Sequence, residues 1–190
     1  MPPPGTVTSR SRVLSDPEMA AIYRAAVKLA FPYGDIVLVA IHTAMRRSEV
    51  GGLRWDFITT ETISLPPALT KNRREHVLPN LIAENLALIP RTSEYLFPAP
   101  SGGPFNSWGS LKAKLDGVCH VQDFVLHDFR RYFSTTMAKL RVPIDVTEAI
   151  LNHVSGSRSA IQRVYDRYDR LTEMRKALEL YEKHLANILR

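Results

Sequence analysis

The chain has 190 residues, which is enough for one large domain or two small ones built around a hydrophobic core. Apolar residues make up 45% of the sequence, as in ordinary soluble globular proteins. The longest largely apolar run, residues 36–45, is too short to span a bilayer, so we expect no membrane role. A single cysteine, Cys119, excludes an internal disulfide and favours a reducing cytoplasm. The net charge of +6 favours a polyanionic partner, of which nucleic acid is the commonest.

The N-terminal segment, residues 1–12, contains three consecutive prolines and predicts a flexible tail or linker with nothing to bury. Ser15 and Glu18 then have the spacing of a capping box, which marks the start of a helix. Apolar residues continue at helical spacing to Ala30, and Pro32 and Gly34 are expected to break this helix. The folded domain is therefore expected to begin near residue 13.

The rest of the chain predicts mostly helices. β-branched and aromatic residues at 57–58 and 62–63 indicate short strands, and residues 75–78 a further extended segment after a basic turn. Helical periodicity is found over residues 35–45, 48–53, 81–88, 107–115, 127–140, 144–151, 158–165 and 171–189. The pattern predicts a mainly α domain with one small antiparallel sheet, an α+β fold.

Four segments place basic or imidazole groups beside apolar scaffolding. They centre on Arg46 with Arg47 and Glu49, on Lys71, on His127 with Arg130, and on His153, which Tyr165 follows twelve residues later. Singly, each has an ordinary explanation, such as a solvated charge at a helix end or a half-buried tyrosine. His127 and Asp128 could also form half of a metal-dependent phosphohydrolase site, but the sequence has no further cluster of His and Asp ligands at helical spacing.

Considered together, these segments resemble the tyrosine site-specific recombinases, the phage-integrase family. Residues 43–49, Thr-Ala-Met-Arg-Arg-Ser-Glu, followed by Leu-Arg-Trp, are similar to the Thr-Gly-x-Arg-x-x-Glu and Leu-x-Trp that surround that family's first catalytic arginine. Residues 126–130 match its His-x-x-Arg box, and residues 151–154 its Leu-Gly-His segment. Residues 70–72 and 77–79 resemble the hairpin that carries its lysine, and residues 164–167, Val-Tyr-Asp-Arg, its nucleophile segment.

The resemblance implies a recombinase catalytic domain over residues 13–190, with the five segments in the family's order. Three positions depart from the usual pattern. Ala44 replaces a glycine, which should be tolerated if the backbone there does not need a positive φ. Asn152 replaces another glycine, and asparagine is the next best residue for a left-handed conformation. The interval between His153 and the tyrosine is longer than usual; Tyr168 lies close by, but Tyr165 is preferred as nucleophile because Asp-Arg follows it.

The resemblance implies DNA cleavage through a 3′-phosphotyrosine intermediate, with no ATP, no cofactor and no metal. In this chemistry Tyr165 attacks the phosphorus, and Arg46 and Arg130 donate forked hydrogen bonds to the non-bridging oxygens.

The remaining site residues have supporting roles in that chemistry. His153 is expected to add a phosphate contact, Lys71 to protonate the departing 5′-oxygen, and His127 to act as base or hydrogen-bond partner of the tyrosine. Glu49 is expected to orient an arginine or cap a helix. Further basic residues are candidates for contacts with the DNA backbone: Arg47, Arg54, Arg73, Arg74, Lys112, Lys114 and Arg131.

The expected partner is double-stranded DNA at attachment sites, in the bacterial nucleoid or an infected host cell. Family members usually carry an N-terminal core-binding domain and act as a tetramer of the full-length protein on DNA. The resemblance leaves no room for that domain here, so we expect weak sequence-specific binding. The apolar stripe of the C-terminal helix (Leu178, Tyr181, Leu185, Ile188 and Leu189) either packs on its own domain or docks on a neighbouring subunit.

Two other functions remain open at the level of sequence. A type IB topoisomerase would share the chemistry but relax supercoils without recognising paired sites. A catalytically silent DNA-binding module would need none of the reactive groups, and the complete set of Arg, Lys, His, Arg, His and Tyr argues against it.

Overall fold

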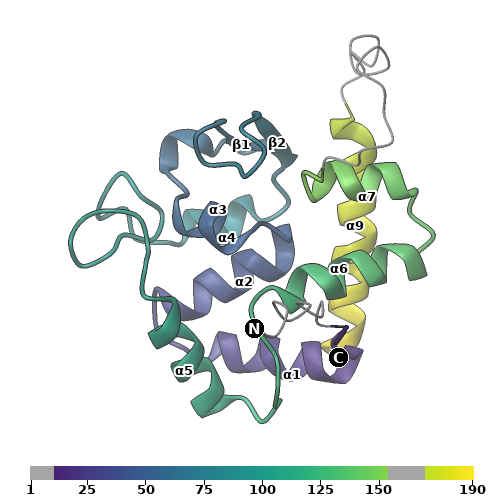
Figure 1. Cartoon of the computed structure of the whole chain (residues 1–190), viewed down its shortest axis with the longest axis horizontal. Coiled ribbons are helices and arrows are strands. Elements are labelled where there is room, and N and C mark those ends of the chain that lie inside the picture. Colours follow the sequence, from purple (N-terminus) through teal and green to yellow (C-terminus); the bar gives the residue numbers. More distant parts are fainter. Residues whose placement is uncertain (1–10, 154–169) are drawn as a thin grey trace, which may run out of the picture.

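The structure is a computed structural model that describes residues 11–153 and 170–190 (Figure 1). Several predictions fall outside the described residues. They are residues 1–10 of the predicted tail, the helix predicted over residues 158–165, and both candidate nucleophiles, Tyr165 and Tyr168. Within the described part no helix is long and apolar enough to cross a membrane.

The described chain is mainly helical with one two-stranded antiparallel sheet, which confirms the predicted fold class. The elements in chain order are α1 (Asp16–Val27), α2 (Tyr33–Thr43), α3 (Arg47–Gly51), a 3₁₀ turn η1 (Trp55–Phe57), β1 (Thr62–Leu65), β2 (His76–Pro79), α4 (Ala83–Ala87), α5 (Trp108–Val118), α6 (Asp128–Lys139), α7 (Ile144–Ile150) and α9 (Leu171–Ile188).

Helix α1 begins with the predicted capping box. The Glu18 amide donates to Ser15 Oγ, and the Ser15 amide donates to the Glu18 carboxylate at 2.8 Å. The prediction for Gly34 was wrong, because Gly34 lies inside α2 and is buried. A Cβ at this position would lie 2.3 Å from the Ala26 carbonyl oxygen, so the glycine allows α2 to pack closely against the end of α1.

The small sheet pairs β1 with β2, with Thr62 opposite Pro79 and Leu65 opposite His76. The strand predicted at residues 57–58 is wrong in part. Phe57 closes the 3₁₀ turn, because its backbone N–H donates a hydrogen bond to the Arg54 carbonyl. Ile58 makes only an isolated β-bridge with Ile63. The connection between the two strands carries Lys71, so the sheet is the base of the predicted lysine hairpin.

Helix α9 packs on its own domain. It contacts α1, α6, α7 and β2, and Figure 1 shows it alongside α6 and α7. Its buried residues are Met174, Ala177, Leu178, Tyr181 and Leu185. Of the two predicted uses of its apolar stripe, packing within the domain is therefore the one observed.

Candidate active site

The predicted basic segments meet at an open cavity of about 790 Å³ between α2, α3, α5 and the start of α6. Four of the predicted catalytic residues line it: Arg46, Lys71, His127 and Arg130. Apolar side chains form much of the rest of the wall, among them Ile36, Val37, Trp108 and Leu111. A cavity with several cations and a partly apolar wall can bind an anion such as a phosphodiester.

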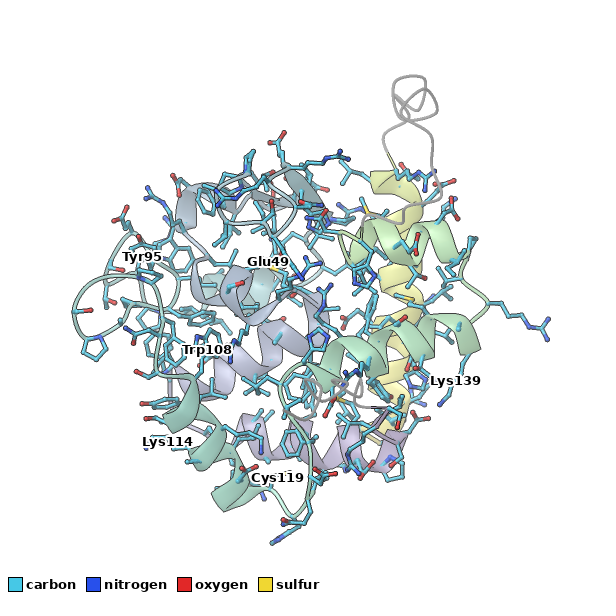
Figure 2. All side chains as sticks on the ribbon, in the orientation of Figure 1. Glu49, Tyr95, Trp108, Lys114, Cys119 and Lys139 are labelled. Carbon is cyan, nitrogen blue, oxygen red and sulfur yellow. The ribbon has the colours of Figure 1, made fainter. Side chains whose placement is uncertain are left out.

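Arg46 is the residue before α3, and the buried carboxylate of Glu49 fixes it. Glu49 is 1% exposed and lies near the centre of the domain in Figure 2. One of its oxygens accepts from the Arg46 amide at 2.8 Å and the other from Arg46 Nη1 at 2.9 Å. The carboxylate therefore neutralises the arginine and limits its rotamers, and the arginine-orienting contact expected for Glu49 is present.

Arg130 lies in the first turn of α6 and is 5% exposed. Its Nη1 donates to the Ala44 carbonyl and its Nη2 donates to the Leu151 carbonyl at 2.8 Å. Nη2 also lies 3.3 Å from His153 Nε2. Burial, with a smaller contribution from the nearby Arg46 charge, lowers the pKa of Arg130 to about 10, so the residue stays charged at pH 7.

The end of α7 supplies carbonyl acceptors for both arginines. The His153 amide donates to the Glu148 carbonyl at 2.9 Å, and the Asn152 amide to the Ala149 carbonyl at 3.1 Å, which is a Schellman motif. Asn152 occupies its left-handed position with φ 48°, as predicted for this replacement of glycine. The Asn152 carbonyl accepts a hydrogen bond from Arg46 Nη2 at 3.3 Å, and the carbonyl before it, that of Leu151, accepts from Arg130. The two guanidiniums are therefore hydrogen-bonded to neighbouring carbonyls of the chain.

Ala44 decides the condition set for the other replaced glycine. It has φ 51°, so the position does adopt the left-handed conformation, and an alanine accommodates it here. The reason is local: α2 ends here, with the Ala44 amide bonded to the Ala40 carbonyl, and the chain reverses toward α3. In this conformation the Ala44 carbonyl accepts from Arg130, which connects the two arginine segments.

The two predicted site histidines lie on either side of Arg130 in the sequence. His127 is the N-cap of α6 and is exposed at the cavity, and burial and the Arg130 charge lower its pKa. His153 is exposed just after α7, and burial and the Arg130 charge lower its pKa also. Both imidazoles are therefore neutral near pH 7 and each can accept a proton.

Lys71 is exposed in the turn between β1 and β2 and lines the same cavity. The turn is closed by the Thr70 hydroxyl, which donates to the Arg74 carbonyl at 2.6 Å and accepts from the Arg74 amide at 3.1 Å. Asn72, beside Lys71, bonds to the side chain of Asn152. These contacts hold the turn of residues 70–74, which we call the lysine turn, next to the end of α7.

Asp128 has a structural role rather than that of a metal ligand. It is fully buried, accepts from the Val125 amide at 2.9 Å and pairs with Arg131 at 2.7 Å. In residues 11–153 and 170–190, no group of three or more His, Cys, Asp and Glu side chains is arranged to hold a metal ion.

His76 belongs to none of the sequence motifs but lies close to both arginines. His76 is 8% exposed in β2, and its Nε2 lies 3.0 Å from the Ala149 carbonyl of α7. Burial lowers its pKa, and the charges of Glu49, Arg130 and Arg46 act on it as well. The alternation of the strand was the available signal, because His76 and Leu78 share the buried face of β2.

The candidate DNA-backbone residues fall into two groups. Arg54 pairs with Asp56 and Glu94, Lys112 with Asp116, and Arg131 with Asp128. Lys114 lies over the ring of Tyr33. The second group is exposed and has no ion pair within the described residues: Arg47, Arg73 and Arg74.

Comparison with known proteins relates this arrangement to a family. Residues 12–167 match the Phage integrase family. Prophage integrase IntZ of Escherichia coli (strain K12) is 28% identical over 183 residues, which are 90% of this chain but 44% of IntZ.

Two solved structures share the fold at 15–18% identity. The integrase from mycobacterium phage Brujita superposes with a TM-score of 0.69 over 98% of this chain and 66% of that one. A lambda integrase tetramer bound to a Holliday junction gives a TM-score of 0.62 over 81% and 50%. The chain thus spans from 44% to 66% of the length of these proteins. Because the family match covers residues 12–167 of 190, the chain belongs to the Phage integrase family.

Proposed function

We propose that this chain cleaves and rejoins DNA through a 3′-phosphotyrosine intermediate, in the site-specific integration or excision of a phage or mobile element. The observation that carries the proposal is the pairing of Arg46 and Arg130 at the end of α7, beside the cavity that Lys71 and His127 also line. Two adjacent guanidinium forks match the non-bridging oxygens of a phosphodiester and can stabilise the charge that builds there during in-line attack.

The arginine pair stabilises the charge that builds on the non-bridging oxygens as the tyrosine attacks. Because Glu49 and the backbone carbonyls hold both guanidiniums in place, little reorganisation is needed when the phosphate arrives. Loss of one such donor typically removes about 3–4 kcal/mol of transition-state stabilisation. His153, whose Nε2 lies 3.3 Å from Arg130 Nη2, is the proposed further contact to the same phosphate.

Proton transfer falls to the groups around the arginines. His127, whose pKa is lowered by burial and by Arg130, is neutral and can accept the tyrosine proton. Lys71, at the cavity, supplies the proton to the 5′-oxygen as the phosphorus–oxygen bond breaks. Tyr165 is the proposed nucleophile, with Tyr168 as the alternative. The phosphotyrosine retains the bond energy, so a second 5′-hydroxyl can reverse the step.

The proposed partner is duplex DNA at attachment sites, within a multimer of the full-length protein. The lambda integrase that shares this fold is a tetramer bound to a Holliday junction. Self-association through the C-terminal helix stays a prediction, and the most buried residues of its stripe (Leu178, Tyr181 and Leu185) are already used inside the domain. The free thiol of Cys119 is buried, in keeping with a reducing cytoplasm.

Covalent trapping tests the proposal. The chain is incubated in EDTA with a pool of random-sequence duplexes, each nicked so that the short 5′-hydroxyl fragment is lost after cleavage. A protein–DNA adduct on a denaturing gel, abolished by Tyr165→Phe but not by Tyr168→Phe, is the expected result. Sequencing of the trapped DNA should show one enriched motif. Adducts with no enrichment would indicate topoisomerase-like cleavage, and DNA binding without any adduct would contradict the proposed activity of this chain.

A further inference from the structure

The lysine turn and the end of α7 are joined by a pair of side-chain amides. Asn72 Nδ2 donates to Asn152 Oδ1 at 2.5 Å, and Asn152 Nδ2 lies 3.4 Å from Asn72 Oδ1. The two residues are 80 positions apart in the sequence. Figure 1 shows the β1–β2 hairpin and α7 side by side. The pair is partly buried, so it is less exposed to competition from water than a surface hydrogen bond.

Asn72 is well placed to transmit this contact to Lys71, its neighbour. Its Oδ1 also accepts from the Arg74 amide at 3.2 Å, so one amide group both organises the turn and attaches it to α7. At the base of the hairpin His76 makes a further contact with α7, through Nε2 and the Ala149 carbonyl. The amide pair is the contact nearer to the tip, where the lysine lies.

Asn152 does what glycine at the same position could not do. The left-handed conformation at the end of α7 favours glycine or asparagine, and either residue leaves the backbone carbonyl available to Arg46. Only asparagine adds a side chain that reaches the hairpin. We propose that Asn152 is a positioning residue that holds the Lys71 turn against the arginine pair through Asn72, so that the proton donor is in place when DNA binds.

The inference rests on the proposed function for its chemical consequence. As the tyrosine oxygen bonds to phosphorus, the bond from phosphorus to the 5′-oxygen breaks, and the Lys71 ammonium gives its proton to that oxygen. A turn that is detached for part of the time leaves the 5′-alkoxide without its proton and slows cleavage. A bridging 5′-sulfur removes the requirement, because a thiolate leaves without protonation.

Trypsin provides a readout that does not depend on activity. Lys71, Arg73 and Arg74 are exposed cleavage sites in the turn. Asn72→Ala and Asn152→Gly in the full chain should raise the rate of cleavage there by about fivefold to tenfold, the effect of losing one hydrogen bond. Asn85→Ala, at an exposed position of α4, is the matched control and should leave the rate unchanged. Unchanged cleavage in both variants would overturn the proposal.

Covalent trapping on paired substrates then tests the link to Lys71. With an ordinary phosphodiester, Asn152→Gly should slow adduct formation about fivefold to tenfold, in proportion to the exposure of the turn. With the 5′-phosphorothiolate, the variant should match the wild-type chain. An equal loss on both substrates would assign Asn152 to general support of the site and overturn its positioning role. If the wild-type chain forms no adduct on either substrate, the proposed function fails, whereas the trypsin rates still decide the attachment of the turn.

Discussion

Arg46 and Arg130 donate hydrogen bonds to consecutive backbone carbonyls at the end of α7, those of Asn152 and Leu151. Two like charges this close repel each other, and the burial of Arg130 adds a desolvation cost. The carbonyls at a helix C-terminus carry partial negative charge and offset part of both costs. Glu49 adds a full negative charge that forms an ion pair with Arg46, and it acts on Arg130 without a direct bond. The two arginines are therefore held differently, and their variants should differ.

Glu49→Gln keeps the shape of the side chain and removes the charge. We expect the free energy of unfolding to fall by about 1–3 kcal/mol, because a buried charge-assisted bond is weakened. Adduct formation should slow by about tenfold or more as Arg46 loses its fixed position. Glu18→Gln is a matched control, because Glu18 also closes a capping box and pairs with an arginine, Arg12. It should lower stability but not the rate of cleavage; equal effects of both variants on the rate would contradict the assignment.

Arg130→Lys tests the need for a fork. A lysine keeps the charge but cannot bond to the Ala44 and Leu151 carbonyls and to a phosphate in one plane. We expect the rate of adduct formation to fall by about 10²–10³, the usual cost of one oxyanion donor. Arg131→Lys, the next residue, alters a partly exposed pair with Asp128 and should leave the rate within about twofold. Single-turnover gels measure both, and near-normal cleavage by Arg130→Lys would exclude the bidentate role.

Local patterns in the sequence were sufficient to predict most helices. The Ser15–Glu18 capping box and the apolar spacing of α9 were visible there because they depend on neighbours in sequence. Gly34 was misread because its reason is tertiary: it allows α2 to approach α1. Residues 57–58 were misread because a short β-branched and aromatic run also suits a 3₁₀ turn that ends in one isolated bridge.

The candidate site could be predicted as a set of residues but not as a network. Motif order brought Arg46, Lys71, His127 and Arg130 together, and the structure places all four at one cavity. No motif indicated that Asn152 would bond to Asn72, because the two side chains are far apart in the chain. The sequence left the conformation of Ala44 open, because an alanine gives no local signal for a positive φ.

Arg141 offers a stability test away from the site. It ends α6 in the left-handed conformation, φ 59°, with the Val142 amide bonded to the Met137 carbonyl at 3.0 Å. Its side chain is exposed. Arg141→Gly should raise the free energy of unfolding by about 1 kcal/mol, because glycine adopts this conformation without the Cβ clash. Arg141→Ala retains the Cβ and should have little effect. Urea unfolding of the wild-type chain and of the two variants measures these differences. Equal free energies of unfolding would show that no strain is stored at Arg141.

The exposed arginines of the lysine turn should contribute to the salt dependence of DNA binding. Arg73 and Arg74 have no ion pair among the described residues, so each is available to a phosphate. Arg73→Gln and Arg74→Gln should each reduce the slope of log affinity against log salt by about 0.9. Arg54→Gln is the control, because Arg54 is occupied by Asp56 and Glu94. A fluorescence anisotropy titration at several salt concentrations measures the slopes, and an equal reduction in the control would refute the distinction.

His76 predicts how the fold responds to acid. Its burial in β2 lowers its pKa in the folded chain, whereas an unfolded histidine titrates near 6.5. Above that value His76 is neutral in both the folded and the unfolded chain, and the free energy of unfolding has its full value. As the pH falls below it, the unfolded chain takes up the proton first, so the free energy of unfolding declines until the folded-state pKa is reached. For one histidine this slope cannot exceed about 1.4 kcal/mol per pH unit.

His76→Gln should make that decline shallower. Glutamine can still donate to the Ala149 carbonyl but has no proton to gain, so the difference from the wild-type chain isolates His76 from His127 and His153, whose pKa values burial also lowers. Urea unfolding at pH 7.5, 6.5 and 5.5, roughly spanning the unfolded-state pKa, gives the slopes. The same substitution at exposed His120 controls for the change of residue type. If the free energy of unfolding fell equally with pH in the wild-type chain and in His76→Gln, His76 would accept a proton without cost to the folded state. Its burial would then not keep it neutral.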